Sequence, residues 1–179
     1  MLNSVVALFN AGAAAAAGDY ESIATVTVGS GGANDIEFTS IPSDYSHLQI
    51  RAMVLGTASA AGINMRFNGD TASNYSAHYL YGTGAAAAAG NDNSTYMYLS
   101  FYPTTDPNVA VCDILDYKDT NKYKTIRSLG GWDSNGSGQV WFFSGNWRST
   151  NAVTSIKIYP FSGTLSQYSH FALYGIKGA

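Results

Sequence analysis

The fold is decided by the stretch His47-Leu48-Gln49-Ile50-Arg51-Ala52-Met53-Val54-Leu55, in which apolar and polar residues alternate. Successive side chains of a β-strand point to opposite faces, so the even-numbered residues from Leu48 to Val54 share one apolar face. His47, Gln49 and Arg51 lie on the opposite face, which meets solvent or a neighbour. The stretch therefore predicts a half-buried β-strand.

The same alternation continues from about residue 20 to the end of the chain, in short runs separated by Gly, Asn, Asp, Ser and Pro. Such separators supply turn geometry, and no segment has a helical period of useful length. The sequence therefore predicts an all-β, jelly-roll-like sandwich of ten or eleven strands over residues 20–179. The expected strands are 21–28, 35–38, 47–55, 63–67, 76–81, 95–102, 109–117, 123–129, 139–146, 153–159 and 169–176.

Two tracts of five alanines bounded by glycines occur at residues 12–18 and 84–90. Their flanking sequences differ, so they are local low complexity and not a domain repeat. Five alanines are fewer than the roughly 12 to 15 residues that an isolated helix needs in water. We therefore expect the second tract to form a surface loop.

Composition and charge narrow the function classes. Only 12% of the 179 residues are charged and the formal net charge is −3, with the nine Lys and Arg residues dispersed along the chain. This distribution gives no electrostatic footprint for nucleic acid. No apolar run approaches the roughly 18 residues that a membrane span needs.

The single cysteine, Cys112, lies in an apolar run and is expected to be a small buried hydrophobe.

Residues 1–19 form an expected N-terminal anchoring arm with an Ala/Gly linker. Its apolar patch comprises Val5, Val6, Leu8 and Phe9, which is too short to fold alone. Exposed apolar side chains of this kind require a partner surface. The alternative, that the patch packs back on its own domain, stays open at this point.

The chain carries few signs of catalytic chemistry. Its three histidines lie in different expected strands, and the sequence contains no metalloprotease, P-loop, CxxC or nucleophile-elbow motif. Asp133 and Asn135 resemble the opening of a calcium loop, but the downstream bidentate Glu is missing. An Asn-Gly hairpin turn explains the same residues and is favoured over a metal site. We therefore expect a protein that is not an enzyme and has no cofactor.

Aromatic residues are the stronger functional signal. The chain has 13 tyrosines, many of them in its middle third. A tyrosine or tryptophan ring offers flat apolar area with a polar tip, which suits subunit interfaces and stacking against sugar rings. Strands also favour aromatic residues for packing alone, so burial in the core is the competing explanation. The candidate carbohydrate-binding residues are Tyr75, Tyr79, Tyr81, Tyr96, Trp132, Trp147 and Arg148.

Several phrases give the chain a family resemblance. They are YESIAT (20–25), FTSIPSDYSHLQIR (38–51), MRFNGD (65–70), SNYS (73–76), DYKDTNKYKT (116–125) and FALYGIKGA (171–179). In their shared order they resemble bacteriophage virion surface proteins, found as tail-fibre or particle-decoration domains. The resemblance implies a β-sandwich displayed on the virion surface, often repeated around a symmetry axis, and it implies no catalytic residues.

Two functional hypotheses follow. In the first, the chain is a structural protein of the virion, anchored by its arm to capsid, tail or baseplate proteins and assembled as a homo-oligomer, with a trimer favoured. In the second, it is a receptor-binding module of a tail fibre that recognises a host surface glycan through its Tyr- and Trp-rich loops. A polysaccharide-cleaving enzyme is a distant third, because no carboxylate pair stands out.

Overall fold

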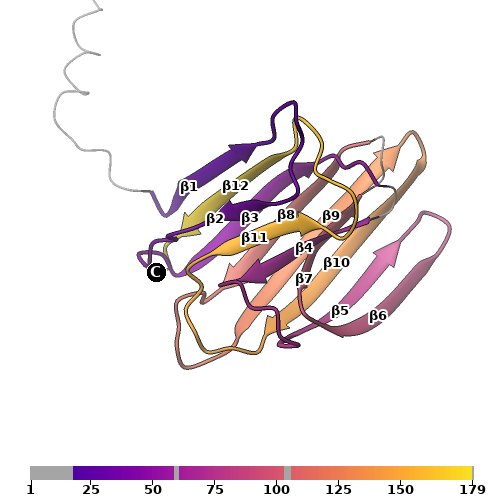
Figure 1. Cartoon of the computed structure of the whole chain (residues 1–179). Helices are drawn as coiled ribbons and strands as arrows, with labels where there is room; N and C mark the ends of the chain where they lie inside the picture. Colours follow the sequence, from indigo (N-terminus) through magenta and orange to yellow (C-terminus); the bar gives the residue numbers. More distant parts are fainter. Residues whose placement is uncertain (1–17, 59–60, 103–105, 179) are drawn as a thin grey trace, which may run out of the picture.

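The computed structural model describes residues 18–58, 61–102 and 106–178, and this part of the chain folds into two antiparallel sheets packed face to face (Figure 1). The larger sheet has eight strands in the order β1-β12-β3-β8-β9-β10-β5-β6. They are β1 (Tyr20–Thr27), β3 (His47–Val54), β5 (Tyr75–Gly82), β6 (Ala87–Ser94), β8 (Asn108–Leu115), β9 (Lys124–Ser134), β10 (Ser137–Trp147) and β12 (His170–Ile176).

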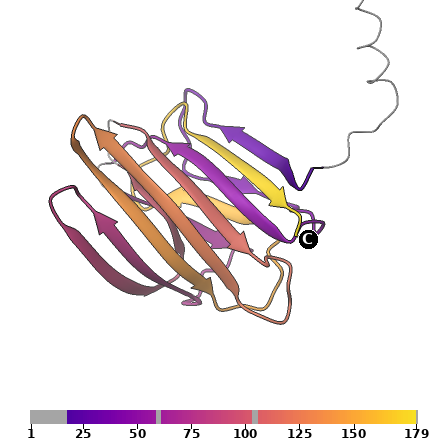
Figure 2. The ribbon, with the colours of Figure 1, turned by 180° about the vertical axis from the view of Figure 1, so that it is seen from behind.

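The smaller sheet covers only part of the larger one. Its order is β2-β11-β4-β7, with strands β2 (Ile36–Phe38), β4 (Ala61–Phe67), β7 (Met97–Tyr102) and β11 (Ile156–Pro160). Figures 1 and 2 both show β5 and β6 extending past the margin of this sheet, while the other face of the larger sheet is left uncovered. The expected all-β sandwich is confirmed, with twelve strands in the described part of the chain.

The core lies between the two sheets, where alternate residues of each strand meet. In β3 the side chains of Leu48, Ile50 and Val54 are completely buried, as the alternation predicts, while Arg51 is exposed. Cys112 is also buried, which confirms its expected role as a small hydrophobe, and burial raises the pKa of its thiol.

Glycine allows the sheets to approach closely at two points on the inner face of β9 and β10. A Cβ atom at Gly145 would lie 2.1 Å from the Sδ atom of Met97, and one at Gly130 would lie 2.2 Å from the Oγ atom of Ser100. Met97 and Ser100 both belong to β7 of the smaller sheet. A side chain at either glycine would therefore push the two sheets apart.

The prediction of a surface loop for residues 84–90 is wrong from Ala87 onward. Residues from Ala87 onward form β6, the edge strand that pairs with β5 in an unbroken antiparallel register from Tyr75↔Ser94 to Gly82↔Ala87. The ring of Tyr79 lies over Gly90, where a Cβ atom would approach to 2.6 Å. Alanine and glycine have little strand preference of their own, so pairing with β5 and this ring contact stabilise the strand.

Candidate contact face of the large sheet

The candidate site is the uncovered outer face of β8, β9, β10 and β5. On a sheet with one solvated face, the outward positions of each strand are normally polar. Here two neighbouring rows of outward positions are apolar, and Val109, Leu129 and Val140 are 59%, 54% and 60% exposed. Leu80, Val111 and Phe142 are exposed as well. Large apolar side chains therefore reach solvent from the strands themselves.

Strand register gathers these side chains into two neighbouring rows. One row consists of Val111, Leu129, Phe142 and Leu80, which are successive partners across β8, β9, β10 and β5. The next row consists of Val109, Gly131, Val140 and Gly82. We call these two rows the apolar face. Residues from four strands make it, so the patch depends on the tertiary fold.

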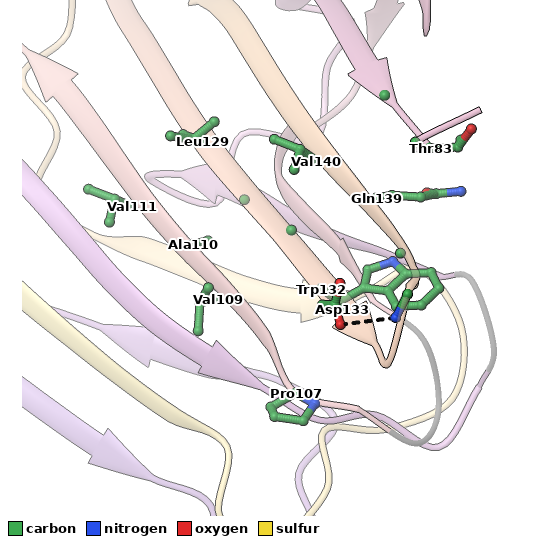
Figure 3. A pocket seen from close by; sticks show the side chains of 16 residues that line it. Thr83, Pro107, Val109, Ala110, Val111, Leu129, Trp132, Asp133, Gln139 and Val140 are labelled. Carbon is green, nitrogen blue, oxygen red and sulfur yellow. Dashed lines mark hydrogen bonds between the residues drawn. The ribbon is translucent and has the colours of Figure 1, made fainter. Parts of the chain in front are cut away.

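The apolar face contains a groove of about 760 Å³ at its Val109 end, bordered by the β5–β6 and β9–β10 turns. Gly131 and Gly82 contribute no side chain to their row, which leaves space between their apolar neighbours. Figure 3 shows Val109, Val111, Leu129 and Val140 around this space, with Asp133 and Gln139 toward the β9–β10 turn. The groove therefore suits an aliphatic or aromatic group better than a sugar.

The outer face becomes polar farther along the same strands. Asp113, Arg127, Ser144 and His78 are successive partners across β8, β9, β10 and β5. Gln49 on β3 continues this row and donates a hydrogen bond from Nε2 to Asp113 Oδ1 at 2.8 Å. A smaller groove of about 230 Å³ lies over this polar region. A partner of the whole face would meet an apolar end and a polar end.

Two of the carbohydrate-binding candidates are in the core. Tyr75 and Trp147 are 0% and 2% exposed, and their rings stack with the centroids 6.4 Å apart. The Tyr75 hydroxyl accepts a hydrogen bond from the Phe67 backbone N–H, and Trp147 Nε1 donates to Asp70 Oδ2 at 2.7 Å. Their assignment as sugar-stacking residues is wrong, because the smaller sheet covers both rings.

Tyr79 and Tyr81 occupy the same face of β5 as Tyr75 but remain half-buried. Tyr81 stacks on Trp141 with the ring centroids 4.2 Å apart, and Trp141 stacks on Phe101 at 4.5 Å. The ring centroids of Tyr79 and Trp141 are 5.8 Å apart. We call Tyr79, Tyr81 and Trp141 the aromatic ledge, which lies on β5 and β10 beside Phe101 of β7. Sequence reasoning missed Trp141, although its alternation with Phe143 places both rings on one face.

The remaining candidates do not gather into a single site. Tyr96 packs edge-on against Tyr98, and the ring centroids are 5.3 Å apart. Trp132 lines the groove of the apolar face, while the Arg148 guanidinium donates to the Ser73 carbonyl at the opposite end of β10. The anchoring candidates Val5, Val6, Leu8 and Phe9 lie outside the described residues.

Asp133 and Asn135 belong to the hairpin turn between β9 and β10. Asn135 and Gly136 have φ angles of 53° and 96°, the backbone geometry of a two-residue turn with both central residues left-handed. The Gly136 N–H points to Asp133 Oδ1 at 3.5 Å. The turn explanation accounts for both residues, and the described residues contain no group of three or more His, Cys, Asp or Glu side chains placed to hold a metal ion.

Charged groups elsewhere form small structural clusters. His47 Nδ1 accepts a hydrogen bond from the Asp116 backbone N–H at 3.0 Å. Lys122 Nζ forms an ion pair with Asp116 Oδ2 at 2.7 Å. Lys124 is completely buried, and its Nζ donates to the carbonyls of Asp119, Lys122 and Thr150. These contacts hold the loops at one end of the sandwich together.

Comparisons with known proteins add little. No protein-family model and no curated protein matches the chain. Among solved structures, it is similar to a xylan β-1,4-xylosidase from Bacillus halodurans C-125, with a TM-score of 0.35 and 9% sequence identity. That match covers 80% of this chain and 33% of the xylosidase chain. Within the described residues, no helix is long and apolar enough to cross a membrane.

Proposed function

We propose that this chain is a non-enzymatic structural protein of a bacteriophage virion, displayed on the particle surface as an oligomeric sandwich and held there by its N-terminal arm. The observation that carries the proposal is the apolar face, because its exposed apolar side chains lie on paired strands of the sheet and leave water only when a partner covers them. The resemblance in the sequence gives the setting, which is a capsid, tail or baseplate. A trimer remains the favoured oligomer.

The energetics of the apolar face support an assembly role. Removing apolar surface from water contributes about 25 cal/mol per Å². A patch of several exposed aliphatic side chains on a folded domain marks an interaction site, whereas single exposed side chains are ordinary. The low share of charged residues, 12%, leaves little on the remaining surface to oppose close contact between subunits.

Deletion of residues 1–18 tests the anchoring part of the proposal. The first strand of the described residues begins at Tyr20, so the truncated chain should fold and unfold like the full chain by circular dichroism. It should no longer incorporate into phage particles, as measured by mass spectrometry of purified virions. Full incorporation of the truncated chain would refute anchoring by this arm.

A second candidate function, recognition of a host surface glycan, is favoured by the aromatic ledge. Half-exposed stacked rings at an open margin of the sandwich resemble the flat platforms on which sugar rings stack. A Tyr81→Ala variant should then lower adsorption of phage to host cells at least tenfold while leaving incorporation unchanged. Tyr123→Ala, which removes an exposed tyrosine outside the ledge, is the matched control. Unchanged adsorption of the Tyr81→Ala particles would refute this function for the ledge.

A further inference from the structure

The size of the apolar face indicates what covers it. Its two rows cross four strands, which spans about 19 Å, and extend about 13 Å along the strands, giving roughly 250 Å². A stable protein interface needs about 800 Å² on each partner. The apolar face is therefore too small to hold two sandwiches together by itself, but it is large enough for a short apolar segment.

The chain contains one uncharged apolar segment outside the described residues. Residues 5–9 read Val-Val-Ala-Leu-Phe, and no charged side chain occurs before Asp19. The groove offers matching chemistry, because Val109, Val111, Leu129 and Val140 provide its apolar lining. An uncharged segment can enter this groove without burying an unpaired charge.

Reach favours a neighbouring chain as the source of the segment. β1 lies four strands from β9 in the larger sheet. Strand pairing through β12 and β3 aligns Thr27 of β1 with Val109, and Tyr20 lies seven residues from Thr27 along β1. This places Tyr20 about 30 Å from the groove. The eleven residue steps from Phe9 to Tyr20 span at most about 40 Å when fully extended. Docking within one chain would need the linker to stay stretched across the outer side chains of β12 and β3, well beyond the roughly 18 Å that a flexible chain of eleven residues spans on average.

We propose that residues 5–9 of a second copy of this chain occupy the groove of the apolar face. The inference rests on the proposed assembly role and specifies the arm's partner as another copy of the chain, in place of a capsid, tail or baseplate protein. An arm that passes from each copy to the next is a head-to-tail contact, and such contacts close into rings when the rotation permits. Three copies linked in this way form a trimer.

Photo-crosslinking of the full chain tests this assignment. Phe9 is replaced by p-benzoylphenylalanine, and these chains are mixed with ¹⁵N-labelled chains that lack the probe. After irradiation, mass spectrometry should find unlabelled arm peptides joined to ¹⁵N-labelled peptides containing Val109, Leu129 or Val140. The same probe placed at Tyr123, which is exposed outside the apolar face, should give no such product.

A Val140→Arg variant serves as the groove control. Val140 is 60% exposed, so the charged side chain should leave folding intact, which circular dichroism checks. The arm-to-groove crosslink should fall at least tenfold. Crosslinks confined to one copy, located elsewhere on the sandwich, or insensitive to Val140→Arg would overturn the inference.

Incorporation into particles is scored separately. A chain that enters virions but crosslinks only to another virion protein would overturn the docking inference and leave the proposed function standing. A chain that is absent from virions but gives the arm-to-groove crosslink in purified form would overturn the proposed function alone.

Discussion

The two faces of β8, β9 and β10 show how the same strands can serve folding on one side and contact on the other. The inward residues of these strands include Phe143 and Trp147, which are almost completely buried under the smaller sheet. The outward residues include Val140 and Phe142, which are as apolar but remain in solvent. Apolar alternation thus identifies a strand, while the presence of a second layer decides which apolar face becomes core.

Two neighbouring phenylalanines in β10 provide the sharpest test of this difference. Phe143 is 1% exposed and Phe142 is 37% exposed. Phe143→Ala should lower the free energy of unfolding by about 3 to 5 kcal/mol, because it removes a buried ring and leaves a cavity. Phe142→Ala should lower it by only about 1 kcal/mol. Chemical denaturation of both variants measures the difference, and equal losses would show that both faces are core.

The inner face also depends on the hydrogen bonds that position Trp147. Asp70 accepts from Trp147 Nε1, Asn74 Nδ2 and the Ala72 backbone N–H. Burial alone would raise the pKa of Asp70, but these hydrogen bonds outweigh it and hold the pKa below its usual value. Asp70→Asn should therefore lower the free energy of unfolding by about 2 kcal/mol at pH 7.

The pH dependence of the Asp70→Asn effect follows from the depressed pKa. The carboxylate stabilises the folded state fully above its unfolded pKa of about 4, and this contribution is lost as the pH falls through the lower folded value. The stability difference between the parent and the variant should therefore shrink below about pH 4. A difference that stays constant down to pH 2 would contradict this role for Asp70.

The close approach of the two sheets at Gly145 is expected to affect the free energy of unfolding less. Gly145→Ala would place a methyl group against Met97, so we expect a loss of about 1 to 2 kcal/mol in unfolding free energy. Ser144→Ala, one position away on the outer face, should change it by less than about 0.5 kcal/mol. Thermal denaturation of the two variants compares these positions. Equal stability of both would indicate that the sheets can separate at this point without cost.

The smallest effect on stability is expected at the centre of the apolar face. Leu129→Ser should change the unfolding free energy by less than about 0.5 kcal/mol, because the side chain is 54% exposed in the single chain. The same change should shift the chain toward monomer in sedimentation velocity at micromolar concentration. A variant that is strongly destabilised, yet assembles normally, would place Leu129 in the core and outside the contact surface.

The sequence predicted the sandwich well because alternation is a local property. The face assignments of His47–Val54 in β3 and the Asn135-Gly136 turn both follow from residues close in sequence. The strand at Ala87–Ser94 was missed because its stability comes from β5 and from Tyr79 lying over Gly90, neither of which its own residues reveal.

The candidate site was harder to predict than the fold. Tyr75, Tyr79 and Tyr81 are separated by even numbers of residues and lie on the same face of β5, yet only Tyr75 is completely buried. The position of the smaller sheet decides this, and the spacing of tyrosines contains no information about it. The apolar face was missed for a similar reason, since its rows exist only once β8, β9, β10 and β5 are in register.

Hydroxyl-radical footprinting of the chain, free and within particles, tests the role of the apolar face most directly. Leu129, Val140 and Phe142 should be oxidised in chains diluted until sedimentation velocity shows only monomer, and become at least fivefold less reactive in the assembled particle. Phe161 and Tyr168, which are 68% and 65% exposed outside this face, provide the internal reference. Equal oxidation of Leu129, Val140 and Phe142 in both states would contradict a contact role for the apolar face.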